Sequence, residues 1–202
     1  MNVDAEERDK RGKSRETPFI FAAVLTGIFF LVGHGIYSAK MNSVTADEYI
    51  HLPVAISILQ TANVEMDSAG SPPLRALLAL PTLVIAPIMD YKSDFWRMKK
   101  SYQFSWTFLR DNFDRYHHLF FIARMSSLFL AVALCLMIYF SVAKLFGRKA
   151  GAVAALLFCF NPETLAHSSL MTVDMLTACF FLPLFSVSYA FCCAPGRSAY
   201  CF

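Results

Sequence analysis

The sequence predicts an all-α, polytopic membrane helix bundle of about four transmembrane helices, with a long outer loop bearing juxtamembrane helices. The 202 residues are 56% hydrophobic and only 16% charged, whereas soluble domains carry roughly a quarter charged residues. Twenty Phe residues fit surfaces that face lipid or its interface. A run of 21 residues, 18–38, contains no charge and is long enough for ~30 Å of hydrocarbon.

Charge and cysteine content exclude two classes of protein. The net charge of +3 is small and spread along the chain, which does not indicate nucleic-acid binding. The long polar segment between Lys40 and His118 contains no cysteine, so the sequence predicts no extracellular disulfide framework. The six cysteines lack metal-binding or redox spacing and are interpreted as small apolar residues.

The amino-terminal part is predicted to be a cytoplasmic tail, 1–17, followed by a transmembrane helix, 18–38. Basic residues precede the apolar run, which favours a cytoplasmic amino terminus. A cleaved signal peptide is the alternative, but Tyr37-Ser38-Ala39 is a poor small-x-small cleavage site and the run is long for that role. We therefore expect a signal anchor.

Residues 39–118 are expected to form an outer loop with juxtamembrane helices, because eight basic and eight acidic side chains are spread along them. The apolar patch 72–89 resembles a span. It contains Arg75 and four prolines, however, and each proline removes a helical hydrogen-bond donor. We predict a juxtamembrane or re-entrant segment there.

Three further transmembrane helices are expected in 119–193, in the runs 119–143, 150–170 and 175–193. The short connection from Lys144 to Lys149 holds three basic residues and no acid, which places it in the cytoplasm by the positive-inside rule. If 72–89 does not cross the membrane, Asp47, Glu48 and Asp174 then share the outer face. The predicted localisation is a multi-pass membrane protein of the bacterial plasma membrane or endoplasmic reticulum, active on the periplasmic, extracellular or lumenal side.

The stretch Thr45–His51 carries the first candidate site. Thr45 and Glu48 fit a capping box, and Asp47 would lie in the first helical turn, where the macrodipole favours an anion. Pro53 weakens this structural interpretation, because it would kink the helix after two turns. In the functional interpretation the carboxylate is a general base or stabilises a bound cation. His51 shares a helical face with Asp47, as a substrate contact or as an interfacial histidine.

Charged residues near span ends supply the other candidates. Arg124 either snorkels to lipid headgroups or binds a phosphate. Glu163, His167 and Asp174 lie beside a span end, where ionisable groups are functional candidates; a simple helix-end cluster is the alternative. Pro162 would break the helix and allow Glu163 and His167 to face a cavity.

Five stretches occur in a particular order. They are Ala46-Asp-Glu-Tyr-Ile-His51, Ser71-Pro-Pro-Leu74, Ala123-Arg-Met-Ser-Ser127, Lys144-Leu-Phe-Gly-Arg148 and Phe160-Asn-Pro-Glu-Thr-Leu-Ala-His-Ser-Ser-Leu-Met-Thr-Val-Asp174. The ordered set resembles the amino-terminal part of the GT-C membrane glycosyltransferases. The nearest group is the dolichyl-phosphate-mannose–protein mannosyltransferases (glycosyltransferase family 39) and their ArnT-like bacterial relatives, over residues 18 to 190.

The resemblance implies transfer of a sugar from a polyprenyl- or dolichyl-phosphate donor to a protein or lipid hydroxyl, with inversion at the anomeric carbon. By analogy, Asp47 would deprotonate the acceptor, Glu48 would support it and Asp174 would line the same cavity. Arg124 would contact phosphate, and His51 and His167 are further candidate substrate contacts. No metal ligand set is predicted, although a divalent cation is compatible with the family.

The chain departs from the family pattern in two places. Ser71 stands where relatives often carry Lys, His or Asn before Pro-Pro-Leu. We therefore expect a phosphate or acceptor contact to be missing at this position. Family members have roughly three times as many spans, and the tail 194–202 no longer follows the pattern. The sequence alone suggests a truncated or frame-shifted fragment. A non-catalytic membrane subunit or transporter piece is the competing hypothesis.

Overall fold

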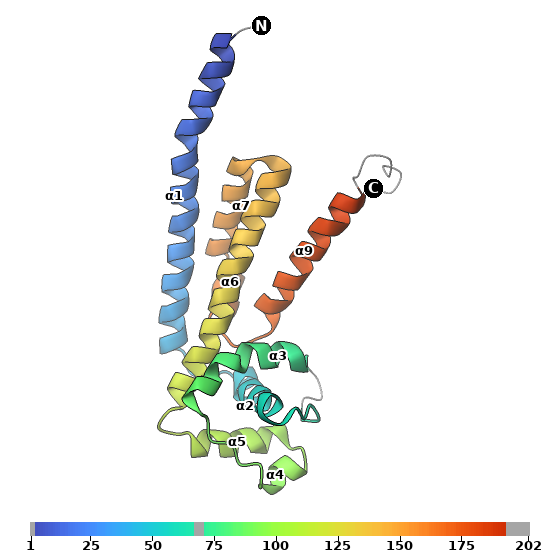
Figure 1. The fold of residues 1–202 in the computed structure, drawn as a ribbon. Coiled ribbons are helices and arrows are strands. Elements are labelled where there is room, and N and C mark those ends of the chain that lie inside the picture. The colour runs from blue at the N-terminus through green and yellow to red at the C-terminus, as the bar shows by residue number, and fades with distance from the viewer. Residues whose placement is uncertain (1–2, 67–70, 193–202) are drawn as a thin grey trace.

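The computed structural model describes residues 3–66 and 71–192, and every regular element within these ranges is a helix (Figure 1). The all-α prediction is confirmed for this part of the chain. The predicted tail at 194–202 lies outside the described residues. The elements are α1 (Val3–Met41), α2 (Ala46–Thr61), α3 (Pro72–Ala79), the 3-10 helix η1 (Leu80–Ile85), α4 (Asp94–Arg97), α5 (Ser101–Asp111), α6 (Tyr116–Phe146), α7 (Arg148–Phe160), α8 (Pro162–Ser168) and α9 (Asp174–Cys192).

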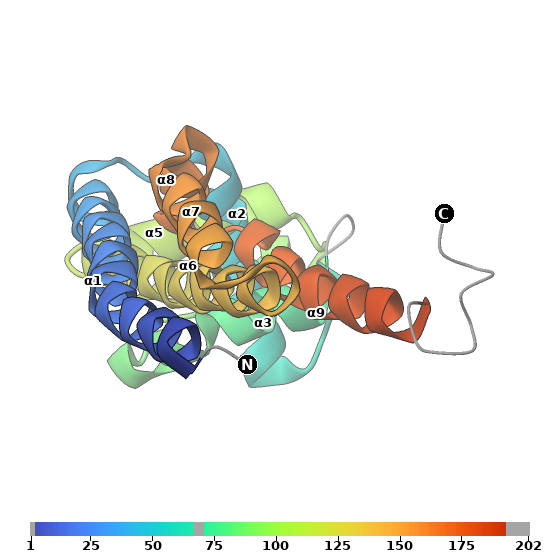
Figure 2. The same cartoon turned by 90° about the horizontal axis from the view of Figure 1, so that it is seen from above.

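The helices form two parts. The long helices α1, α6, α7 and α9 run along one general direction, and α2 to α5 form a cap across one end of them (Figure 1). Viewed along the bundle, α1, α6 and α7 cluster together while α9 leans outward beside α6 (Figure 2). The turn between α6 and α7 lies at the end opposite the cap. The chain therefore brings Thr45, Tyr116 and Asp174 to the cap end.

Two described helices are long and apolar enough to cross a membrane: Pro18–Met41 within α1, and α6. They agree with the first two predicted spans. Their outward faces are apolar, as shown by the strongly exposed rings of Phe19, Phe29 and Phe129. Exposed rings of this kind on long apolar helices are typical of surfaces that face lipid.

The third predicted span takes a different form. The helix α7 ends at Phe160 after 13 residues, a length of about 20 Å, which is shorter than ~30 Å of hydrocarbon. Pro162 then begins the separate helix α8, and the side chain of Asn161 accepts a hydrogen bond from the Glu163 N–H. The predicted helix break at Pro162 is confirmed, and the predicted run 150–170 is divided between α7 and α8.

The apolar patch 72–89 does not run along the bundle. It forms α3 and η1, which lie in the cap across the end of the long helices (Figure 1). Pro72 and Pro73 occupy the first helical turn, where a missing N–H costs nothing. One apolar cluster joins this cap to the bundle through Leu52, Leu78, Phe108, Phe120 and Met171.

The hairpin of α6 and α7 depends on a glycine. A Cβ atom added at Gly151 would lie 2.7 Å from the Tyr139 carbonyl oxygen and 2.9 Å from Ala143 Cβ. We expect Gly151→Ala to lower the free energy of unfolding by about 1–3 kcal/mol through overpacking. Gly33→Ala is the matched control, since its Cβ would meet nothing within 4 Å. Equal unfolding midpoints for the two variants in detergent would contradict this packing.

Candidate functional site

The start of α2 forms a capping box. The Glu48 N–H donates to Thr45 Oγ1 at 3.4 Å, and the Thr45 N–H donates to Glu48 Oε2 at 3.1 Å. The capping-box interpretation is therefore confirmed. Pro53 does not end the helix, because α2 continues through it to Thr61. The capping box thus determines where α2 begins, and it directs the Glu48 side chain into the protein interior.

Glu48 and Arg124 form a buried, two-pronged ion pair. Arg124 Nε donates to Glu48 Oε1 at 2.8 Å and Nη2 donates to Oε2 at 2.7 Å. The side chains are 0% and 2% exposed. This fork-to-carboxylate geometry is the strongest form of charge-assisted hydrogen bonding between side chains.

Arg124 also holds the end of α1. Its Nη1 donates to the carbonyls of Ala39 (2.8 Å) and Asn42 (2.9 Å), and Nη2 donates to the Ser43 carbonyl at 2.8 Å. The last carbonyls of a helix have no partner within the helix, and a cation there is favoured by the macrodipole. Arg124 therefore connects α6 to the ends of α1 and α2.

Glu48 reaches a third distant segment. The backbone N–H of Met171 donates to Glu48 Oε1 at 2.9 Å, and the hydroxyls of Ser38 and Ser169 lie 3.0 Å apart. The loop before α9 is thereby attached to the same buried carboxylate. Residues separated by 76 and 123 positions along the chain meet at Glu48, and Asp174 follows Met171 by one short turn.

The charge of Glu48 is stabilised by these contacts. Burial alone would raise its pKa, but the hydrogen bond from Arg124, the Met171 N–H, the charge of Arg124 and the Thr45 N–H together lower the pKa below the ordinary value of 4.5. The side chain is therefore an anion at neutral pH and has no free capacity to accept a proton from a substrate.

This lowered pKa predicts a pH dependence of stability. The contribution of Glu48 is present above its unfolded pKa and is lost as the pH falls through its lower folded pKa. We expect the unfolding midpoint of the wild type to decline below about pH 4.5 more steeply than that of Glu48→Gln. Parallel pH profiles for the two proteins would contradict the assignment.

The remaining predicted site residues lie nearer the surface. Asp47 is exposed in the first turn of α2, and His51 is half-buried one turn further on. His167 Nε2 lies 3.3 Å from Glu163 Oε2, and its Nδ1 lies 3.1 Å from Asp174 Oδ2. The second contact is close but is not aligned as a hydrogen bond. His167 thus lies between two exposed carboxylates at the cap end.

Metal binding has no preassembled site in the part of the chain that the structure describes. No group of three or more His, Cys, Asp or Glu side chains there is arranged to hold an ion. The two nitrogens of His167 point to different carboxylates, so Glu163, His167 and Asp174 do not converge on one point as metal ligands do.

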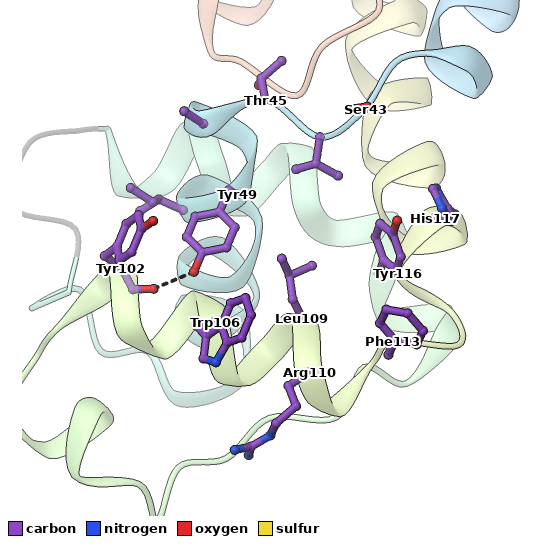
Figure 3. Close-up of a pocket in the computed structure, with 13 residues that line it drawn as sticks. Ser43, Thr45, Tyr49, Tyr102, Trp106, Leu109, Arg110, Phe113, Tyr116 and His117 are labelled. Atoms are coloured by element: carbon purple, nitrogen blue, oxygen red, sulfur yellow. Dashed lines mark hydrogen bonds between the residues drawn. The ribbon is translucent and has the colours of Figure 1, made fainter.

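A cavity of about 670 Å³ opens beside the start of α2 (Figure 3). Its walls come from α2, α5 and the start of α6, with Tyr49, Tyr102, Trp106 and Tyr116 around it. The Tyr49 hydroxyl donates to the Tyr102 carbonyl at 3.0 Å. Burial, together with the nearby Tyr102, raises the pKa of Tyr49, so this hydroxyl remains a neutral donor. A mostly apolar cavity with several aromatic rings and a few polar groups is typical of a small-molecule site.

Sequence reasoning missed this cavity. Trp106 and Tyr116 fall within the predicted outer loop 39–118, for which the sequence indicated no binding site. The signal was present, because Tyr102, Trp106 and Leu109 recur at the spacing of one face of a helix and all three line the cavity.

No protein-family model, curated protein or solved structure matches the chain. Over residues 3–66 and 71–192 the fold is all-helical, with two helices long and apolar enough to cross a membrane. These helices indicate association with a membrane.

Proposed function

We propose that the chain is a membrane glycosyltransferase, or the amino-terminal part of one. It would move a sugar from a polyprenyl- or dolichyl-phosphate donor to a protein or lipid hydroxyl on the outer face of the membrane. The supporting observation is that three of the ordered stretches meet at one carboxylate. Glu48 belongs to the first stretch and bonds to Arg124 of the third and to Met171 of the fifth, although nothing in the local pattern requires these stretches to be neighbours.

The proposed topology has four crossings. In it, α1 and α6 each cross the membrane once, α7 and α8 together make the third crossing, and α9 makes the fourth. The basic turn between α6 and α7 lies at the end opposite the cap (Figure 1), which favours a cytoplasmic turn and an outer cap. Asp47 and Asp174 would then both face the compartment outside the cytoplasm.

The proposed reaction uses the exposed acid of the pair. Asp47 accepts the proton of the acceptor hydroxyl, and that oxygen attacks the anomeric carbon from the side opposite the phosphate. A new C–O bond forms as the bond to the phosphate oxygen breaks, the configuration inverts, and the lipid phosphate leaves with the bonding electrons. A positioned carboxylate typically contributes a factor of about 10² to 10⁴ in such proton transfers.

The other residues receive supporting roles in this proposal. Glu48 and Arg124 are positioning residues, because their polar atoms are engaged with one another and with the backbone. The expected phosphate contact by Arg124 is therefore not part of the proposed mechanism. Asp174 and His167 lie at the cap end of the helix bundle, on the proposed outer side. His51 is a candidate substrate contact. The cavity beside Tyr49 is the candidate acceptor site.

A non-catalytic membrane subunit is the second candidate function. It is favoured by one observation: the contacts of Glu48 are complete without any ligand, as a purely structural helix start would require. The two candidates differ in whether lipid phosphate is released.

The direct test supplies membranes containing the chain with a polyprenyl-phosphate-linked sugar and measures release of polyprenyl phosphate. We expect release that depends on an added hydroxyl acceptor. Release at the level of membranes without the chain would contradict transfer by this chain and favour the structural role.

A further inference from the structure

A second cavity, of about 450 Å³, lies between the end of α1 and the first turns of α6. Three basic side chains line it: Lys40 from α1, and His117 and His118 from α6. All three are exposed. Among the described residues no acidic side chain belongs to its lining, and the charge of Arg124, which also lines it, is neutralised by Glu48.

The cavity is lined by apolar side chains as well as by basic ones. Phe120 and Phe121 line it together with the cations, and the ammonium of Lys40 lies 5.7 Å from the centre of the Phe121 ring. This cation–π contact holds the ammonium against the cavity wall. The positive end of the α6 macrodipole adds to the attraction for an anion.

The position of the cavity identifies the class of anion. It lies where two membrane-length helices both reach their boundary, since the apolar part of α1 ends at Met41 and α6 begins at Tyr116. Cations in this zone attract the phosphates of membrane lipids, and the neighbouring phenylalanine rings suit the first carbons of a lipid chain. An inorganic anion from bulk solution would gain nothing from these rings.

We propose that this cavity binds a lipid-borne phosphate, with Lys40, His117 and His118 contacting the phosphate oxygens and Phe121 contacting the adjoining hydrocarbon. The inference rests on α1 and α6 lying in a membrane and not on the transfer reaction. It goes beyond the proposed function, which places the chemistry at Asp47.

The test uses the full chain in lipid nanodiscs at about pH 6, below the ordinary pKa of histidine. Lipids that remain bound after release from the disc are identified by native mass spectrometry. We expect anionic lipid to be retained over phosphatidylcholine. Lys40→Gln should reduce that preference about fivefold, the factor associated with one cation near the surface, and adding His117→Gln and His118→Gln should abolish it.

Two matched variants separate lost charge from misfolding. Lys40→Arg should keep the preference, and Lys100→Gln, an exposed lysine outside the cavity, should leave it unchanged. Equal retention by the triple variant and the wild type would overturn the proposal, as would equal losses for Lys40→Gln and Lys100→Gln.

Two lipid arms identify the source of the phosphate. Discs doped with phosphatidylglycerol report on a bulk phospholipid, and discs doped with polyprenyl phosphate report on a lipid of the donor class. Preferential retention of either one supports the site and names its ligand. Displacement of bound lipid by an equal concentration of inorganic phosphate would overturn the claim that the phosphate is lipid-borne. This experiment does not measure sugar transfer, so its result is independent of whether the proposed reaction occurs.

Discussion

Replacing Arg124 with methionine should lower the free energy of unfolding by about 3–5 kcal/mol, the usual cost of removing one partner from a buried ion pair. The substitution leaves the carboxylate of Glu48, 0% exposed, without its counter-charge. It also leaves the carbonyls of Ala39 and Ser43 without the donors that now satisfy them. Reversible denaturant unfolding in mixed micelles measures the change.

Two comparisons make this prediction specific. Arg97→Met is the matched control, because Arg97 is 69% exposed and pairs with the equally exposed Asp94; it should change stability by less than about 1 kcal/mol. The double variant Glu48→Leu, Arg124→Met should be less destabilised than Arg124→Met alone, since it buries no uncompensated charge. If the Arg124→Met protein were as stable as Arg97→Met, the Glu48–Arg124 pair would not stabilise the attachment of the cap (α2 to α5) to the long helices.

Asp47→Asn should abolish sugar transfer, with a loss of about 10²-fold to 10⁴-fold if the carboxylate is the general base. The amide has nearly the same shape but cannot take up the acceptor proton. Because Asp47 is exposed, the substitution should leave membrane insertion and the unfolding midpoint intact. The assay is the release of polyprenyl phosphate from membranes that contain the chain, with a hydroxyl acceptor added.

Asp94→Asn is the matched control for that experiment. Asp94 is also an exposed acid in the first turn of a helix, so its replacement removes the same charge without touching the proposed site. Wild-type transfer by Asp47→Asn would rule out the base role. Equal losses in both variants would attribute the effect to surface charge.

Local sequence signals predicted the features that depend on local physics. The length and composition of 18–38 and 119–143 predicted two membrane-length helices, and Thr45 with Glu48 predicted a capping box that the structure contains. The prolines of 72–89 predicted a segment that does not run along the bundle as a spanning helix. Each of these features depends on neighbours within a few residues, which is the range that periodicity and capping patterns report.

The pairing of Glu48 with Arg124 could not be predicted in the same way. A charge within an apolar helix predicts a partner or a functional role, but the identity of the partner depends on how α1, α2 and α6 pack. Both interpretations of Arg124 placed it at lipid or phosphate, whereas it is buried against Glu48. The break between α7 and α8 at Pro162, by contrast, follows from a local signal and was predicted, although the apolar composition continues past it.

The proposed site requires Asp47 and Asp174 to face the same compartment. Single cysteines placed at these two exposed positions, in a chain whose six native cysteines are replaced, can be labelled with an impermeant maleimide in sealed vesicles. Phe146→Cys, exposed at the opposite end of α6, is the control for the other side. We predict that positions 47 and 174 react together from the outer face, and that position 146 reacts only after permeabilisation. Labelling of 47 and 174 from opposite sides would contradict the account.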